Sequence, residues 1–225
     1  AQEEQTMSVQ RFQSVRPQAD LPQLLAILGP RRPTNALSPQ GSWYSIRNLS
    51  DASVEIAIFD EIGYYGITAS DFTRDIGAIK APNITLRINS PGGDVFDGIA
   101  IFNAIRRHPA YVTAYIDGIA ASAASFIAMA ADKIIMSPHA TMMIHEASGL
   151  CIGTANDMKT MAAILDKSSN EIASIYAGRA GGSIEQWREH MRAETWISDQ
   201  EAVDLGLADA IDGKMMACPS CGEMA

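Results

Sequence analysis

Apolar residues recur along the chain with two alternating periods, and this alternation predicts an α/β fold. Residues 85–89 alternate between apolar and polar side chains, as a half-buried strand does, and residues 111–116 are a second run rich in strand-forming residues, which is expected to break at Asp117-Gly118. Between them, residues 95–107 carry apolar side chains at three- and four-residue steps, which predicts a helix that Pro109 stops. A strand, a helix and a second strand form a βαβ unit, so we expect a parallel sheet with right-handed crossovers.

The other periodic segments continue this pattern. A long helix is expected from Thr154 to the Gly181-Gly182 break, and its methionine-rich stripe is typical of a core or of a seam against a partner helix. His108, at the end of its helix, is expected to place a favourable charge at a helix C-terminus. Residues 43–48 are expected to begin the domain. Further strands are predicted at residues 54–59, 134–136, 141–144 and 196–197, and further helices at residues 70–79, 121–131 and 183–192 and after Ser198.

Composition divides the chain into three parts. Residues 1–42 are polar and rich in Gln, Pro and Arg, so we expect an N-terminal arm that packs on a neighbour or stays mobile. Residues 43–213 are the expected single α/β domain, and residues 214–225 a C-terminal tail. The tail holds Cys218 and Cys221, half of a zinc-knuckle pattern. No second Cys/His pair follows, so an unpaired tail is the preferred interpretation and no metal site is predicted.

Charge and hydropathy argue against several function classes. The net charge of −9 at pH 7 argues against a nucleic-acid binder, which needs a basic face. No run approaches the ~18 apolar residues of a membrane span, and no secretory signal is visible, so a cytoplasmic protein is expected. No P-loop nucleotide-binding motif occurs, and no cofactor is predicted.

Candidate chemistry is concentrated in residues 111–145. Ser122 is expected in the first turn of the helix at residues 121–131, where the N–H of Ala123 has no intrahelical partner and could stabilise an acyl oxyanion. His145 directly follows a predicted strand, at the end where catalytic side chains collect in α/β proteins. A serine at a helix start is more often an N-cap, and a lone histidine after a strand is usually structural, so this pair needs independent support.

That support comes from residues 90–93, Ser-Pro-Gly-Gly, which follow the predicted strand at residues 85–89. Paired glycines permit positive φ angles and let another backbone come close. Such a loop can donate an N–H to an oxyanion, or bind an extended peptide as an added strand, although most Pro-Gly-Gly runs are only turns.

Together these motifs resemble the ClpP family of serine proteases. The resemblance covers residues 54–212 and is closest to the ClpP-like head maturation proteases of tailed bacteriophages and prophages, on the segments IAIFDEIGYYGITASDF and AETWISDQEA. It implies a ClpP/crotonase-like fold of repeated βαβ units with a protruding handle helix, assembled as a homo-oligomeric ring. The motifs that carry it occur in the family's order: INSPGGDVFDGIAIFNAI, DGIAASAASFIAMAAD, MMIHEA and ETWISDQEAVDLGLAD.

The resemblance implies a Ser-His-acid triad. Ser122 matches the family's serine and His145 its histidine, while Gly92 and Ala123 match the positions whose N–H groups form the oxyanion hole. The acid is where this sequence departs from the family. Glu194 stands at the position of the family's aspartate, and a glutamate can orient and charge-stabilise a histidine in the same way.

Alternatives for the acid and the nucleophile remain open. Asp199 and Asp157 are the other candidate acids, although each is expected at a helix start, and His190 could form a local pair with Glu194. If no acid reaches the histidine, the site could work as a weaker Ser-His dyad. Ser125 is the rival nucleophile, but it lies nearly one turn deeper, where its hydroxyl could bond back to a carbonyl of the preceding turn.

The implied activity is that of a serine endopeptidase, with the substrate extended beside Gly93, Asp94 and Val95. The head-maturation resemblance implies scaffold and capsid proteins as substrates inside a prohead, without an ATPase. One alternative is a proteolytic subunit that works with a separate Clp-type ATPase. Others are a crotonase-type enzyme that acts on acyl-CoA thioesters without the Ser-His pair, and a structural or assembly protein that keeps the fold without turnover. No lysine lies near the motifs, which argues against a Ser-Lys protease.

Overall fold

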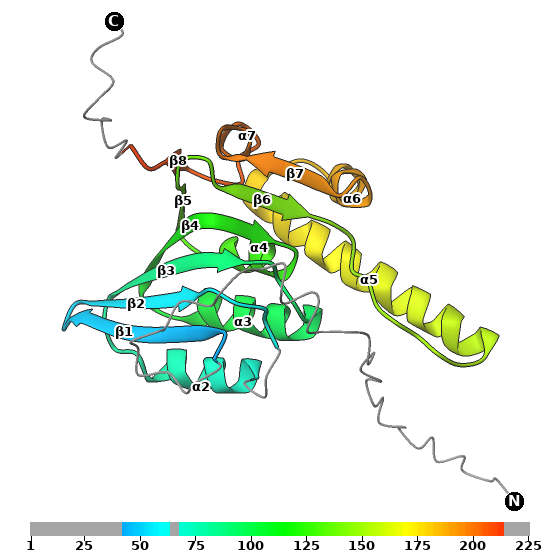
Figure 1. The fold of residues 1–225 in the computed structure, drawn as a ribbon, viewed down its shortest axis with the longest axis horizontal. Helices are drawn as coiled ribbons and strands as arrows, with labels where there is room; N and C mark the ends of the chain where they lie inside the picture. The colour runs from blue at the N-terminus through cyan, green and yellow to red at the C-terminus, as the bar shows by residue number, and fades with distance from the viewer. Residues whose placement is uncertain (1–41, 64–67, 214–225) are drawn as a thin grey trace, which may run out of the picture. The chain divides into compact units, whose positions relative to one another are not determined.

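The computed structural model describes residues 42–63 and 68–213, in which helices pack around one mixed β-sheet (Figure 1). The predicted α/β class is confirmed. The predicted N-terminal arm lies outside the described residues, apart from residue 42, and so does the predicted tail with Cys218 and Cys221.

Most neighbouring strands of the sheet run parallel, as the βαβ pattern predicts. The strand order is β1-β2-β3-β4-β5-β8, while β6 pairs with β4 and β7 pairs with β6. Within the described residues, the antiparallel pairs are β1 with β2 and β6 with β7. β1 must run antiparallel to β2, because the two residues that join them are too few for a parallel crossover. The strands are β1 (Tyr44–Ser50), β2 (Ser53–Ile58), β3 (Asn83–Ser90), β4 (Tyr111–Ala121), β5 (Lys133–Met136), β6 (Thr141–Ile144), β7 (Thr195–Ser198) and β8 (Ala210–Ile211).

The helices gather at two places along this sheet. Figure 1 shows α2 and α3 together beside the first strands, and α5, α6 and α7 beside β6 and β7. Alternate residues of β3 are buried, so the alternation that predicted this strand reflects a face packed on the core. The helices are α2 (Ala69–Ala78), α3 (Val95–Arg107), α4 (Ala123–Ala128), α5 (Ala155–Ala180), α6 (Ile184–Arg192) and α7 (Asp199–Asp204).

The strand β4 is longer than predicted, because it changes partners instead of ending at Asp117-Gly118. Its first part pairs with β5, and its last three residues pair with β6. The acidic side chain of Asp117 forms an ion pair with Arg87 of β3. A Cβ on Gly118 would lie 2.7 Å from Oδ1 of Asn89, and that same oxygen accepts the Ile119 N–H. The glycine therefore makes room for a side chain that satisfies the backbone where the strand shifts register.

The helix α4 is shorter than the predicted helix at residues 121–131. It begins two residues later because β4 extends to Ala121. Beyond Ala128, the N–H groups of Met129, Ala130 and Ala131 donate to carbonyls three residues back, which is the tighter 3₁₀ pattern. The prediction was therefore nearly right about the C-terminal end of the helical turn, and wrong about where the strand gives way to it.

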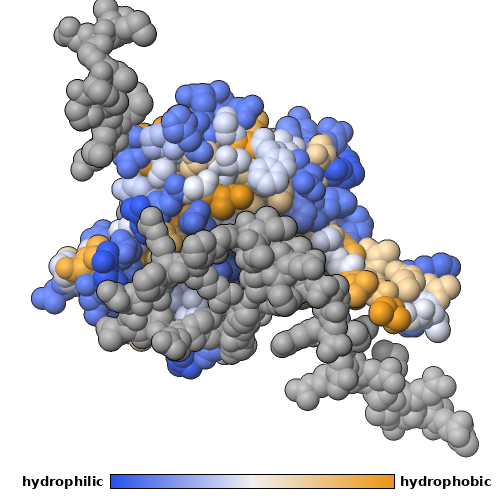
Figure 2. All heavy atoms as spheres, in the orientation of Figure 1, coloured by the Kyte–Doolittle hydropathy of each residue, from blue (hydrophilic) through white to orange (hydrophobic). Residues whose placement is uncertain are grey.

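The long helix α5 has two different halves. Its buried residues lie between Ser168 and Tyr176, whereas its first ten residues are almost all exposed. Figure 1 shows this exposed half extending away from the sheet, as the protruding handle helix was predicted to do. Orange and tan atoms gather over the projecting end in Figure 2, where Leu150, Ile152 and Met158 are exposed hydrophobic residues.

Candidate active site

Ser122 stands at the junction between β4 and α4, with backbone angles of φ 52° and ψ −122°. A positive φ is rare for a residue with a side chain, and such conformations cost about 1–3 kcal/mol, so they persist only where their surroundings hold them. The Ser122 N–H donates to the carbonyl oxygen of Met143 at 2.9 Å, which fixes the residue to β6. Its hydroxyl makes no capping bond to α4, so an N-cap role does not account for this serine.

His145 is the residue that follows β6. Because β6 runs parallel to the last residues of β4, the chain leaving β6 lies beside the chain leaving β4. The Nε2 atom of His145 lies 2.7 Å from the Ser122 Oγ. For the hydroxyl to donate, Nε2 must be unprotonated and Nδ1 must carry the ring proton. Serine and histidine are therefore arranged as a nucleophile and its general base.

Glu194 is the residue before β7, and no hydrogen bond joins it to His145 in the described residues. The register of β6 and β7 pairs Ile144 with Thr195, and one further step would place His145 opposite Glu194. The φ of Glu194 is 49°, which turns the chain out of the ladder, and its side chain is exposed. Across residues 42–63 and 68–213, no hydrogen bond reaches the Nδ1 atom of His145. The acid of the triad therefore stays a prediction.

The carboxylates of the other two candidate acids bind groups outside the site. Asp157 accepts two hydrogen bonds in the capping box that begins α5. Asp199 accepts the backbone N–H of His139 at 2.8 Å, and this bond holds the pKa of Asp199 below its usual range. His190 forms no hydrogen bond or ion pair with Glu194 in the described part of the chain, so the expected competition from His190 is not seen.

The space beside the Ala123 N–H is open because residue 92 is a glycine. A Cβ on Gly92, whose φ is +96°, would lie 2.8 Å from the Ala123 nitrogen and 2.7 Å from the Ser122 Cβ. The N–H of Gly92 itself donates to the Ser90 Oγ at 3.1 Å. The N–H of Gly93, by contrast, makes no hydrogen bond to any described residue. The geometry therefore favours Gly93 over the predicted Gly92 as a second oxyanion donor.

One edge of this glycine loop is already paired. Ile62 donates its N–H to the Gly92 oxygen at 2.8 Å and accepts the Asp94 N–H at 3.1 Å. Backbone groups of successive residues in an extended chain point to opposite edges, so Gly93 presents its own N–H and C=O to the free edge. The Asp94 side chain caps α3 by accepting two backbone N–H groups. Of the three predicted substrate-binding residues, Gly93 and Val95 therefore line the site, and Asp94 holds the helix start.

A cavity of about 60 Å³ lies directly beside Ser122 and His145. Its apolar wall comes from Val95, Phe126, Ile172 and Tyr176. A cavity of ~150 Å³ holds a benzene ring. The smaller volume here suits a short aliphatic side chain of a substrate better than an aromatic one.

Ser125, the rival nucleophile, is fully buried and is not among the residues that line this cavity. Its hydroxyl donates to the carbonyl oxygen of Ser122 at 2.6 Å and lies 2.7 Å from the hydroxyl of Tyr176. The predicted bond back to the preceding turn is therefore present. A buried hydroxyl whose proton is already donated is poorly placed to act as a nucleophile, which favours Ser122 for that role.

A buried arginine that the sequence did not single out binds Glu146, the residue that follows the histidine. The Arg188 side chain donates to Glu146 at 2.7 and 2.9 Å, to the Asp166 carboxylate at 2.8 Å and to the Asn170 side chain at 2.6 Å. Glu146 directly follows His145, so this cluster ties the segment that carries the base to α5 and α6. No sequence motif marks it, because Arg188 and its partners come from three separate segments.

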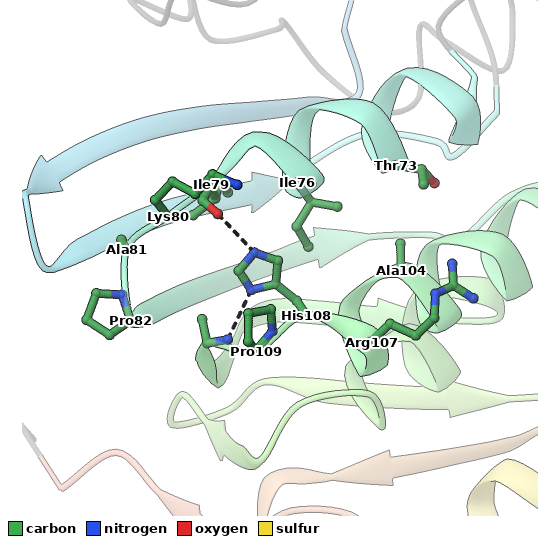
Figure 3. Close-up of a pocket in the computed structure, with 12 residues that line it drawn as sticks. Thr73, Ile76, Ile79, Lys80, Ala81, Pro82, Ala104, Arg107, His108 and Pro109 are labelled. Atoms are coloured by element: carbon green, nitrogen blue, oxygen red, sulfur yellow. Dashed lines mark hydrogen bonds between the residues drawn. The ribbon is translucent and has the colours of Figure 1, made fainter.

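A larger cavity of about 520 Å³ lies at the other end of the sheet, beside the starts of β3 and β4 (Figure 3). The ring of His108 projects into this region between Ile79 and Pro109. Its Nδ1 accepts the Ala110 N–H at 3.1 Å, and its Nε2 lies 3.3 Å from the Ile79 carbonyl oxygen. Both ring nitrogens of His108 therefore bind backbone groups, which is a structural role that the sequence did not predict, and the expected charge at this helix end stays a prediction.

Two general features bear on what the site can do. Among residues 42–63 and 68–213, no cluster of three His, Cys, Asp or Glu side chains is arranged to hold a metal ion. None of the helices in those same ranges combines the length and the apolar character that crossing a bilayer requires.

Comparison with known proteins agrees with the sequence motifs. Residues 55–214 match the Clp protease family. The chain is 34% identical over 147 residues to the ATP-dependent Clp protease proteolytic subunit 2 of Corynebacterium glutamicum, which covers 64% of this chain and 69% of the relative. It is 33% identical over 183 residues to the subunit of the same name from Corynebacterium diphtheriae, covering 73% and 88%. The ATP-dependent Clp protease proteolytic subunit of Porphyromonas gingivalis is 27% identical over 179 residues, covering 73% and 81%.

Proposed function

Because the chain belongs to the Clp protease family, it is a serine-type endopeptidase, and we propose that it works as the proteolytic subunit of a Clp-type assembly with Ser122 and His145 as its catalytic pair. The observation that carries the residue assignment is the 2.7 Å contact between the Ser122 Oγ and the His145 Nε2. Ser122 also holds a strained backbone conformation and makes no capping bond to α4. A serine with a purely structural role would not need such strain.

The proposed reaction is acyl transfer to water. His145 Nε2 takes the proton of the Ser122 hydroxyl as Oγ bonds to the carbonyl carbon of the scissile peptide. The tetrahedral intermediate collapses when the C–N bond breaks and the leaving amine takes the proton from His145. Water then attacks the acyl-enzyme ester, giving its proton to His145, and the second collapse returns a proton to Ser122 and releases the new carboxylate.

Two backbone N–H groups are proposed to stabilise the oxyanion. One belongs to Ala123, the first residue of α4, and the other to Gly93, whose N–H has no partner among the described residues. Gly92 supports the same site differently, because its missing side chain keeps the space beside Ala123 open. The substrate would extend along the free edge of Gly93.

The acid of the triad is proposed to be Glu194. Continuing the β6–β7 register by one step would set Glu194 opposite His145, and the Glu194 carboxylate has no competing partner within the described residues, which supports this proposal. A rotation of this exposed side chain toward the Nδ1 of His145 would complete the triad. Asp157 and Asp199 are less suitable because their carboxylates already accept hydrogen bonds at helix starts.

We further propose that copies of this chain assemble through the projecting half of α5. Leu150, Ile152 and Met158 expose apolar side chains at that end, which is unusual for a surface that water alone covers. The relatives are named as proteolytic subunits of ATP-dependent proteases, which favours an oligomer that receives protein substrates from a separate Clp-type ATPase.

Head maturation in a phage or prophage is the finer alternative. It rests on the likeness of the segments IAIFDEIGYYGITASDF and AETWISDQEA to head maturation proteases. The names of the relatives point instead to ATP-dependent Clp proteases, so the Clp-type reading has the stronger support.

The test combines a serine-directed probe with a substrate assay. A fluorophosphonate should label the intact chain and its Ser174→Ala control, which alters a half-buried helical serine, but not Ser122→Ala. Labelling that persists in Ser122→Ala would overturn the assignment. A Clp-type reading predicts that short peptides are cleaved by the chain alone, whereas folded proteins are degraded only with a Clp-type ATPase and ATP. Efficient cleavage of a capsid or scaffold protein without any ATPase would favour head maturation.

A further inference from the structure

A chain of two hydrogen bonds joins the long helix α5 to the backbone of the nucleophile. The hydroxyl of Tyr176, on α5, lies 2.7 Å from the Ser125 Oγ, and Ser125 Oγ lies 2.6 Å from the carbonyl oxygen of Ser122. Ser125 is 0% exposed and Tyr176 is 1% exposed, so water does not share these bonds. Neither residue belongs to the catalytic pair proposed above.

The chemistry of the three groups determines which one donates in each of these two hydrogen bonds. The Ser122 carbonyl can only accept, so the single proton of the Ser125 hydroxyl is used there. The Tyr176 hydroxyl must then donate to Ser125. Burial raises the pKa of Tyr176, and the hydrogen bond with Ser125 lowers it by less, so the phenol keeps its proton throughout the physiological range. Each bond polarises the next, which strengthens the contact at the Ser122 carbonyl.

The orientation of the Ser122 carbonyl matters because the Ala123 N–H lies in the same peptide plane. The carbonyl of Ser122 and the N–H of Ala123 belong to one trans peptide, so they point in opposite directions. A group that pins the carbonyl toward the protein interior therefore turns the N–H toward the open space that Gly92 leaves beside Ala123. That space is where the proposed oxyanion forms.

The peptide needs to be pinned because Ser122 is strained. With φ 52° and ψ −122°, this residue could relax by rotating the adjacent peptide, which would withdraw the Ala123 N–H from the oxyanion. On the other side, the Ser122 N–H is held by the Met143 carbonyl. The Ser125 backbone N–H also donates to the Ser122 carbonyl, at 3.0 Å, but such a bond is part of any first helical turn. The side-chain bond from Ser125, backed by Tyr176, is the additional restraint.

We propose that Ser125 and Tyr176 are positioning residues that orient the Ser122–Ala123 peptide so that its N–H faces the substrate oxyanion. This inference rests on the proposed function of Ser122. It also gives α5 a part in catalysis, because Tyr176, the first donor in this pair of hydrogen bonds, lies on that helix.

The test uses the full chain with the variants Tyr176→Phe and Ser125→Ala. Tyr176→Phe keeps the aromatic wall of the 60 Å³ cavity and removes only the hydroxyl. Tyr44→Phe is the matched control, because Tyr44 is also a buried tyrosine whose hydroxyl bonds a side chain, that of Asp75, away from the site. Fluorophosphonate labelling gives the readout, since its phosphonyl oxygen occupies the oxyanion position, and it separates the labelling rate kinact from the binding constant KI.

An oxyanion donor is worth about 10²–10³ in rate, so we expect kinact to fall about tenfold in Tyr176→Phe and about a hundredfold in Ser125→Ala. KI should stay within twofold of the intact chain, and Tyr44→Phe should leave kinact unchanged. Because the two residues act in series, the double variant should be no slower than Ser125→Ala alone.

The outcomes separate this inference from the proposed function. Labelling that depends on Ser122 but has an unchanged kinact in Tyr176→Phe would overturn the positioning role and leave the nucleophile in place. A rise in KI with unchanged kinact would also overturn it, because the residues would then only shape the pocket. Labelling that survives in Ser122→Ala would remove the premise instead. If Ser125→Ala does not fold, Tyr176→Phe alone decides.

Discussion

The two ends of β4 differ in how their polar groups are used. At its carboxyl end, beside a cavity of only about 60 Å³, Ser122 and His145 bond each other while the Gly93 N–H and the His145 Nδ1 have no partner in the described residues. At its amino end, the cavity is about 520 Å³, yet both ring nitrogens of His108 bind backbone groups. Uncommitted donors and acceptors, rather than volume, therefore mark the end of the sheet where chemistry can occur.

The largest effect on activity is expected from His145→Ala, and His108→Ala is its counterpart at the other end of β4. His145→Ala removes the proposed base, and comparable losses in serine proteases lower kcat by about 10⁴–10⁶-fold. His108→Ala should leave kcat unchanged, but it leaves a buried backbone N–H without a partner and should lower the free energy of unfolding by about 1–3 kcal/mol. Peptide hydrolysis and urea unfolding of both variants measure the two effects.

Two outcomes of this experiment would contradict the comparison between the ends of β4. If His108→Ala loses activity while it folds and melts like the intact chain, the amino end would hold a functional site that hydrogen bonding does not reveal. If His145→Ala retains activity, the carboxyl end of β4 would not hold the catalytic base.

A second comparison sets two glycines against each other. Gly92→Ala would place a Cβ 2.8 Å from the Ala123 nitrogen, at a residue whose φ is +96°. We expect kcat to fall by about 10²–10³-fold, as when an oxyanion donor is lost. Gly178→Ala, in α5, has nothing within 4 Å of the new Cβ and should stabilise the protein by about 0.5–1 kcal/mol. Kinetics and thermal melting distinguish the outcomes, and full activity in Gly92→Ala would show that this space is not the oxyanion site.

The sequence predicted the scaffold of the site better than its contacts. Apolar periodicity located β3 and α3 closely, because each buries one regular face. The predicted break at Gly118 was wrong, since periodicity cannot show that β4 exchanges one neighbouring strand for another. Ser122 and His145 could be paired from motifs alone, because both follow strands that end at the same edge.

Other contacts of the site depend on residues far apart in the chain. Arg188 meets Glu146 and Asp166 only because α6, β6 and α5 converge, and no local pattern encodes that meeting. The same is true of the bond between Tyr176 and Ser125. The preference for Gly93 over Gly92 as an oxyanion donor depends on a single side chain, Ser90, whose bond to the Gly92 N–H is a matter of rotamer and not of sequence pattern.

The buried arginine that binds Glu146 offers a third test at the carboxyl end. Arg188→Met removes the buried member of the cluster and leaves Glu146 and Asp166, whose side chains are 34% and 66% exposed. No charge is stranded in the interior, so we expect a cost of about 1.5–3 kcal/mol from the lost hydrogen bonds to charged groups. Arg192→Met breaks an ion pair with Glu185 in which both side chains are well exposed, and should cost no more than about 1 kcal/mol. Urea unfolding compares them, and equal costs would mean that the buried cluster contributes nothing special.

The smallest effect concerns acid pH and compares the helix caps on the two sides of the sheet. Hydrogen bonds with Thr154 lower the pKa of Asp157 at the start of α5, and those with Thr68 lower the pKa of Asp71 at the start of α2. A depressed pKa means that the folded state binds the proton less readily than the unfolded state, whose aspartates titrate near ~3.9. Each cap therefore adds stability above that pH, and the contribution is lost as the pH falls through the lower pKa of the folded state.

The expected result is a melting temperature that declines on acidification below about pH 4, where unfolded aspartates take up protons. Asp157→Asn and Asp71→Asn should each melt lower than the intact chain at pH 7 and lose less on acidification, because the titrating group is gone. Thermal melts from neutral to acid pH measure this difference. A variant that keeps the full acid dependence of the intact chain would show that its cap does not contribute, and unequal losses would reveal which side of the sheet gives way first.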